Sequence, residues 1–176
     1  MNKREIIKWI ECDGGPHLLL EKRLVPHWMG TTDIQDDDKA TDYDRACNIE
    51  DYIGIIPVSN GCGLVVSEDV AKSTWIASED GNGGFLVVLN YIGDDVDESL
   101  IVNKIRTVDR SLFEATNLQF SVQDNYVYLF AACDCGPEWL YGCAEIQLKP
   151  GIYSIDTIDS YDFDECSFRI HRLRRS

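Results

Sequence analysis

Beyond residue 50, short apolar runs recur along the chain, separated by glycine, proline and asparagine. Runs of this length that are rich in Val, Ile, Leu, Tyr and Phe are typical of β-strands. Many short strands with few helices predict a mainly β fold, as a sandwich or a β-rich α+β arrangement. We expect strands at residues 52–58, 63–67, 84–92, 100–108, 118–122, 126–132, 144–148, 153–158 and 167–173.

The other segments are less regular. Residues 6–11 and 18–20 are apolar and flank the turn Asp13-Gly14-Gly15-Pro16, which predicts a β-hairpin. Pro26 and Gly30 restrict any helix between residues 22 and 30 to a short one. We further expect an exposed acidic loop at 31–42, two helical turns at 42–50 and a short helix at 68–77.

An internal repeat indicates how the chain is organised. Its two copies predict tandem related β-meander units at residues 49–110 and 111–176, packed as one sandwich-like globule. The N-terminal segment 1–48, with its hairpin and acidic loop, would pack on this globule. Chance similarity among short strands is the alternative explanation. Three pairs of segments match in the same order: 58–66 with 122–130, 84–88 with 151–155, and 97–105 with 164–173.

The charge of the chain excludes some classes of function. The 176 residues include 31 acidic against 16 basic side chains, a net charge of −15. A nucleic-acid binder needs a basic face for phosphate contacts, so this acidity argues against one. No apolar run approaches the roughly 20 residues that span a bilayer, and the N-terminus lacks the pattern of a signal peptide. We therefore expect a cytoplasmic protein that contacts neither nucleic acid nor membrane. The only strongly basic segment is 169–176, with four arginines and no acidic residue.

The chain has seven cysteines, which we interpret as reduced thiols that serve mostly as small buried apolar residues. Cys133, Cys135 and Cys143 lie within eleven residues of one another. Structural zinc sites commonly use four ligands from paired Cys-x-x-Cys motifs, and a fourth ligand is missing nearby. We predict no metal and no cofactor, with these three thiols as the candidates for a metal-binding alternative.

No catalytic motif is present. The sequence contains no G-x-S-x-G nucleophile elbow, no Walker loop and no dinucleotide-binding glycine fingerprint. The glycine-rich segment 81–84 precedes a predicted strand rather than a helix, so we interpret it as a turn. We therefore predict that the protein is not an enzyme.

Acidic residues cluster at 36–38, 42–44, 94–98 and 159–165. Trp28 stands beside the first two clusters, between Pro26 and Gly30, and we expect it to be partly exposed. An aromatic side chain ringed by polar groups is what tight interfaces use. The candidate partner contacts are Trp28, Asp36, Asp37, Asp38, Asp42 and Asp44.

Two motifs near the N-terminus carry a resemblance to a known family. They are Trp9-Ile-Glu-Cys-Asp-Gly-Gly-Pro-His-Leu-Leu-Leu-Glu and Leu24-x-Pro26-x-Trp28-x-Gly30, and weaker matches follow at 42–47, 52–58, 151–153 and 168–173. On these residues the sequence resembles the immunity protein 21 family of bacterial polymorphic toxin systems. The motif positions are Trp9, Gly14, Gly15, Pro16, Pro26, Trp28 and Gly30.

This resemblance implies an antidote that binds and neutralises a cognate toxin, and it brings no catalytic residues with it. The acidity fits a basic partner such as a nuclease toxin, because opposite charge speeds association and carboxylates can imitate a phosphate backbone. Two alternatives stay open: a small cysteine-based metal-binding protein, and a ligand-binding β-sandwich or scaffold.

Overall fold

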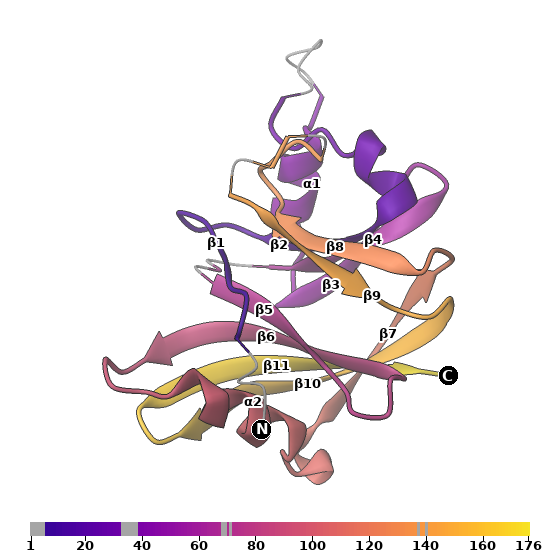
Figure 1. Cartoon of the computed structure of the whole chain (residues 1–176). Coiled ribbons are helices and arrows are strands. Elements are labelled where there is room, and N and C mark those ends of the chain that lie inside the picture. The colour runs from indigo at the N-terminus through magenta and orange to yellow at the C-terminus, as the bar shows by residue number, and fades with distance from the viewer. Residues whose placement is uncertain (1–5, 33–38, 68–69, 71, 137, 140) are drawn as a thin grey trace.

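The computed structural model describes residues 6–32, 39–67, 70, 72–136, 138–139 and 141–176, which form two antiparallel sheets (Figure 1). Sheet A has six strands in the order β1-β5-β6-β11-β10-β7, and sheet B has five in the order β3-β4-β2-β8-β9. The predicted mainly β class is confirmed. The strands are β1 (Ile10–Glu11), β2 (His17–Glu21), β3 (Ile53–Val58), β4 (Gly61–Val66), β5 (Lys72–Ala77), β6 (Gly83–Ile92), β7 (Glu114–Val122), β8 (Tyr126–Ala131), β9 (Cys143–Gln147), β10 (Gly151–Phe163) and β11 (Cys166–Arg175).

The helices are short. They are α1 (Asp42–Cys47), α2 (Glu98–Arg106) and the 3-10 helices η1 (Lys22–His27) and η2 (Arg110–Leu112). Helix α1 and the brief η1 agree with the predicted helical turns at 42–50 and the short helix within 22–30. Among the described residues, no helix combines the length and the apolar character that crossing a bilayer requires.

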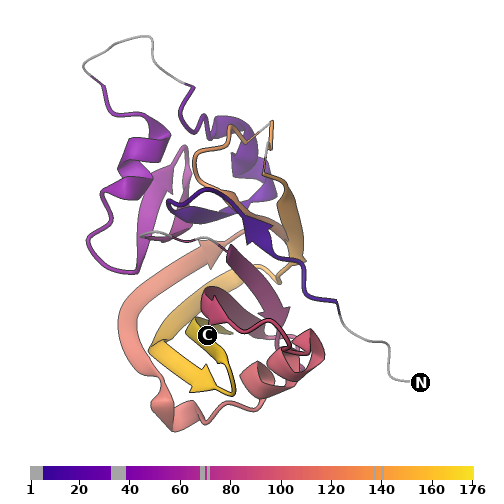
Figure 2. The same ribbon diagram turned by 90° about the vertical axis from the view of Figure 1, so that its left-hand side faces the viewer.

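Three apolar clusters arrange the molecule in layers. The largest lies between the two sheets and includes Leu19 of β2, Leu86 of β6 and Tyr153 of β10. Successive residues of a strand point to opposite faces, so each sheet also has an outer apolar face. Helix α2 covers the outer apolar face of sheet A, and α1 together with η1 covers the outer apolar face of sheet B, as Figures 1 and 2 show. The predicted sandwich-like packing is therefore present.

The predicted hairpin of residues 6–11 with 18–20 is wrong. Strand β1 pairs with β5 in sheet A, whereas β2 lies in the middle of sheet B between β4 and β8. Gly14 and Gly15, at φ 111 and 105, turn the chain from one sheet to the other. A strand whose residues are all buried, as in β2, needs partners on both sides, and the preceding segment supplies neither.

Residues 100–108 form most of helix α2 instead of the predicted strand. Asp97 caps this helix, because its carboxylate accepts a hydrogen bond from the backbone nitrogen of Ser99 at 2.9 Å. Ile101 and Ile105, one turn apart, are buried against sheet A. A short apolar run fits either element, and here the cap and the helical spacing prevail.

The helix predicted at 68–77 is wrong in its described part, where residues 72–77 form β5. This strand has neighbours on both sides, β1 and β6. Thr74 is 1% exposed, and its hydroxyl donates to the backbone oxygen of Lys8 at 2.8 Å. β-branched residues such as Thr74 and Ile76 favour a strand once partners exist for it.

The two predicted units contribute to both sheets. The first unit, residues 49–110, contributes β3 and β4 to sheet B and β5 and β6 to sheet A. The second unit, residues 111–176, contributes β8 and β9 to sheet B and β7, β10 and β11 to sheet A. The third pair of the repeat is wrong, because 97–105 belongs mainly to α2 whereas 164–173 leads into β11. The division of the chain into three segments stays a prediction.

Candidate functional site

Trp28 is a core residue, so the prediction that it is partly exposed is wrong. Its side chain is 0% exposed and packs on the outer face of sheet B. The indole nitrogen donates to the backbone oxygen of Ala132 at 2.9 Å, which satisfies its one polar atom. Gly30 lies at φ 58, and a Cβ there would overlap the backbone oxygen of Cys133. The Pro-x-Trp-x-Gly motif thus fixes packing, and Trp28 is not available to a partner.

The acidic contact candidates have different outcomes. Residues 36–38 lie outside the described residues. Asp42 accepts a hydrogen bond from the backbone nitrogen of Met29 at 2.9 Å. Asp44 forms a capping box with Thr41, whose backbone hydrogen bond lowers the pKa of the Asp44 carboxyl. Both carboxylates help to begin α1, and their role as partner contacts stays a prediction.

The remaining motif positions also have structural tasks. The indole nitrogen of Trp9 donates to Glu98 at 3.1 Å, which links the N-terminal segment to α2. A Cβ on Gly15 would lie 2.6 Å from the hydroxyl oxygen of Tyr43, so only glycine fits there without a shift. Pro16 is buried directly before β2. Trp9 thus helps to hold the outer layer of sheet A, whereas Gly15 and Pro16 shape the chain as it enters sheet B.

All seven cysteines are free thiols, but the expectation that most are buried is wrong. Within the described part of the chain, no three or more His, Cys, Asp or Glu side chains come together to hold a metal ion, and Cys133, Cys135 and Cys143 form no such group. The metal-binding alternative therefore gains no support. Cys166 is buried, Cys47 is exposed, and Cys12, Cys62, Cys133, Cys135 and Cys143 are intermediate.

One thiol does adjoin a histidine. The sulfur of Cys12 lies 3.2 Å from Nε2 of His17, and Nδ1 of His17 lies 2.6 Å from the hydroxyl of Ser73. Burial raises the pKa of the Cys12 thiol and lowers that of His17 to about 4. An activated cysteine needs the opposite shift, toward the thiolate. The arrangement is therefore a neutral hydrogen-bonded chain rather than a nucleophile with its base.

A groove at one side of the two sheets gathers carboxylates around an exposed aromatic ring. Its cavity volume is about 300 Å³. Asp51 and Tyr52 reach it from the loop before β3, Glu114 from the start of β7, and Thr157 and Asp159 from β10. Figure 2 shows β7 curving along this side of the molecule from sheet A toward sheet B. We call this feature the acidic groove.

The charge of the acidic groove is negative on balance. Among the described residues, Arg169 is the cation that contacts the groove: its guanidinium lies 3.2 Å from the ring centroid of Tyr52, and its Nε lies 3.8 Å from a carboxylate oxygen of Asp159. Asp51 and Glu114 are exposed and form no ion pair within the described ranges. Tyr52 remains 37% exposed. The groove thus offers a partly exposed aromatic ring and two exposed carboxylates that form no ion pair with any other described residue.

The floor of the acidic groove includes a buried hydroxyl that contacts a buried imidazole. Thr157 is 9% exposed, and its hydroxyl lies 2.8 Å from Nδ1 of His171, which is 0% exposed. Burial, with a smaller contribution from Arg169, lowers the pKa of His171 to about 3. The imidazole is therefore neutral at physiological pH, and it is a structural partner of Thr157.

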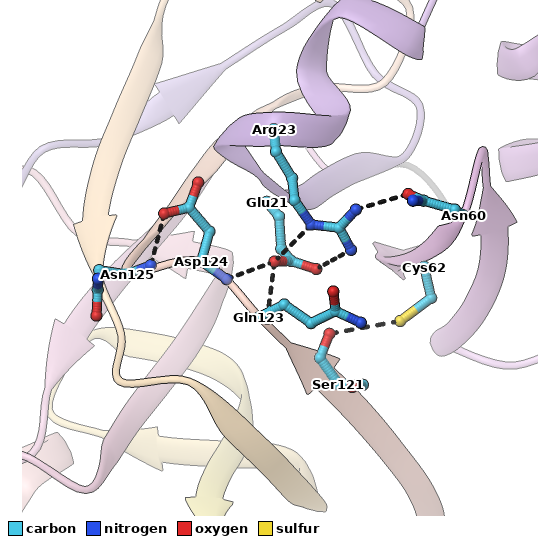
Figure 3. Close-up of polar contacts among 8 residues, drawn as sticks. All are labelled: Glu21, Arg23, Asn60, Cys62, Ser121, Gln123, Asp124 and Asn125. Atoms are coloured by element: carbon cyan, nitrogen blue, oxygen red, sulfur yellow. Dashed lines mark hydrogen bonds and ion pairs between the residues drawn. The ribbon is translucent and has the colours of Figure 1, made fainter.

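A buried carboxylate holds the far end of β7 in place (Figure 3). Glu21 is 0% exposed, and one of its oxygens accepts hydrogen bonds from the backbone nitrogens of Gln123 and Asp124 at 2.8 and 2.7 Å. Arg23 donates to the same carboxylate at 3.2 and 3.3 Å and to Asn60 at 2.6 Å. These bonds tie the β7–β8 turn to the end of β2 and to the β3–β4 turn.

Sequence reasoning missed the acidic groove. Of its carboxylates, only Asp159 belongs to an acidic cluster of the sequence, and Asp51 and Glu114 stand apart from the others. The groove arises where the chain before β3 meets β7 and β10, and no local pattern indicates that meeting.

The comparisons with known proteins agree with the motifs. The model of the family described as Immunity protein 21 matches residues 8–165 of the 176-residue chain. Searches of the curated proteins and of the solved structures found no significant match. The family match includes the N-terminal motifs, all of sheet B, every strand of sheet A except β11, and every residue that lines the acidic groove. The chain therefore belongs to the immunity protein 21 family.

Proposed function

We propose that this protein neutralises a cognate bacterial toxin in the cytoplasm by binding it in a stoichiometric complex, without catalysing a reaction. The family match over residues 8–165 carries this proposal. The net charge of −15 and the neutral Cys12–His17 pair support a binding role over a catalytic one. The toxin would present a basic surface, as nucleases do when they grip phosphate.

We propose the acidic groove as the docking surface. Asp51 and Glu114 supply exposed carboxylates that form no ion pair with other described residues, and Tyr52, which is 37% exposed with Arg169 stacked on its ring, supplies an aromatic anchor. Interfaces concentrate binding energy in such aromatic anchors, whereas rim charges mainly set the association rate. A lysine or arginine of the toxin fits a cavity of about 300 Å³.

The proposal is tested by co-expression with the toxin encoded beside this gene. We expect growth to be rescued and the two purified proteins to elute together from a sizing column. If growth is not rescued and no complex forms, the proposed function is wrong. Turnover of a substrate by the purified protein alone would likewise contradict it.

Removing the negative charges of the acidic groove tests whether it is the docking surface. The double variant Asp51→Asn/Glu114→Gln should slow association with the toxin about three- to tenfold at low salt, with a smaller effect on dissociation. Stopped-flow kinetics at two salt concentrations measure this. A matched control, Glu79→Gln/Asp95→Asn, removes two exposed carboxylates elsewhere and should leave association unchanged.

Neutralising Asp36, Asp37 and Asp38 tests the acidic loop in the same assay. If only the loop variant slows association, the loop and not the groove is the docking surface.

A further inference from the structure

A second cavity is lined by arginines, in contrast to the acidity of the chain as a whole. It has a volume of about 320 Å³ and lies where the β5–β6 turn, the start of β6, η2 and the end of β11 meet. Arg110, Arg172, Arg174 and Arg175 line it, together with Asp80 of the β5–β6 turn. We call it the arginine pocket.

The carboxylates near the arginine pocket do not neutralise it. Asp80 accepts hydrogen bonds from Ser78 at 2.6 Å and from the backbone nitrogen of Asn82 at 2.9 Å. Asp156 contacts Arg172 at 2.5 Å and Arg174 at 3.0 Å, and it does so through a single oxygen. Arg110, Arg172 and Arg174 therefore outnumber these two carboxylates, in a protein whose net charge is −15.

Aromatic rings hold two of these guanidinium groups. The guanidinium of Arg172 lies 4.3 Å from the ring centroid of Phe113, and that of Arg110 lies 5.1 Å from the ring centroid of Phe85. Stacking fixes the donors in advance, so a ligand orders them at a smaller loss of entropy. The Nε of Arg172 is buried and has no hydrogen-bond acceptor in the described part of the protein. An oxyanion beside it would provide one.

We propose that the arginine pocket binds a small oxyanion, a molecule that carries a phosphate or carboxylate group. The planar donor fork of arginine matches the oxygens of both groups. The volume lies at the lower end of the range for small-molecule sites, which favours a small soluble anion over a macromolecule. The acidic surface around the pocket repels a polyanion, whereas a small anion contacts the arginines inside it. This site is independent of toxin binding through the acidic groove.

The test is a titration of the full chain with inorganic phosphate and, separately, with malonate, at constant ionic strength kept by chloride. Backbone amides of residues 78–85 and the arginine Nε signals report binding in nitrogen–proton NMR spectra. We expect saturable shifts confined to these groups. Saturation with phosphate assigns the phosphate class, and saturation with malonate alone assigns the carboxylate class.

Variants locate the site. Arg110→Gln and Arg174→Gln should each weaken binding about tenfold, since each removes a charge-assisted hydrogen bond. Both side chains are exposed enough to be replaced without emptying the core, and Asp156 keeps Arg172 when Arg174 is lost. Lys22→Gln removes one exposed charge next to sheet B and should leave binding unchanged. If neither anion saturates, or if Lys22→Gln weakens binding as much as the arginine variants, the proposal is wrong.

Discussion

Replacing Glu21 with glutamine is expected to lower the free energy of unfolding by about 3–5 kcal/mol. The substitution keeps the size of the side chain, so it leaves no cavity and changes only charge and hydrogen bonding. One carboxylate now accepts from Arg23, Gln123 and Asp124. The glutamine amide has only one oxygen, and its NH₂ group cannot accept a hydrogen bond. Some of the donors that now bond to Glu21 would therefore lose their acceptor. Buried donors without an acceptor are costly.

Equilibrium denaturation in urea measures this loss. Glu11→Gln is the matched control, because Glu11 forms an exposed ion pair with Lys72 at 2.9 Å and the chemical change is identical. An exposed pair of this kind contributes about 1 kcal/mol or less. Equal effects of the two substitutions would show that the Glu21 network stabilises the fold no more than a surface ion pair does.

We also expect Glu21→Gln to weaken toxin binding, because the hydrogen bonds of Glu21 position the β7 wall of the acidic groove.

Acidification from pH 7 to pH 4.5 is expected to cost the fold roughly 2–3 kcal/mol for each of two histidines. Burial lowers the pKa of His17 to about 4 and that of His171 to about 3, from the ordinary value of 6.5 that both regain on unfolding. Below pH 6.5 the unfolded chain therefore binds protons that the folded protein does not. Stability is complete above pH 6.5 and falls as the pH drops toward the folded pKa values.

Urea denaturation across this pH range measures the loss directly. His171→Gln should flatten the pH dependence by about half, since one of the two groups is removed. His27→Gln, which replaces an exposed imidazole, is the control. NMR titration of the wild-type histidine rings provides a second measurement, in which His17 and His171 should keep the shifts of neutral imidazole down to pH 5. Protonation of both rings near pH 6.5 would contradict the prediction.

Much of the strand pattern was predictable because burial on alternate residues is a local property. The strands at β4, β8, β9 and β11 lie close to their predicted positions. Strand β10 runs to Phe163, beyond the predicted end at 158, because it continues into a tight pairing of Phe163 with Cys166 in the next strand. A strand end depends on its partner, which a run of apolar residues does not identify.

The errors have a shared cause. At 68–77 and 100–108 the apolar residues fit a helix and a strand equally well, and the structure assigned each segment the alternative element. The cap at Asp97 was the local signal for α2. For β5 the deciding contacts are with β1 and β6, both distant in the sequence. Trp28 likewise became a core residue because Ala132 supplies an acceptor for its indole nitrogen.

The sequence by itself determined the class of fold, the family and the acidic character of the protein, since strand-length apolar runs, the N-terminal motifs and the count of charges can each be read locally. Only the tertiary structure decided where the acidic groove and the arginine pocket lie. Asp51, Glu114 and Asp159 become neighbours when β7 pairs with β10 beside the chain that enters β3. Alternation specifies which face of a strand is buried, but strand order and the meeting of distant turns follow from the packing of the whole core.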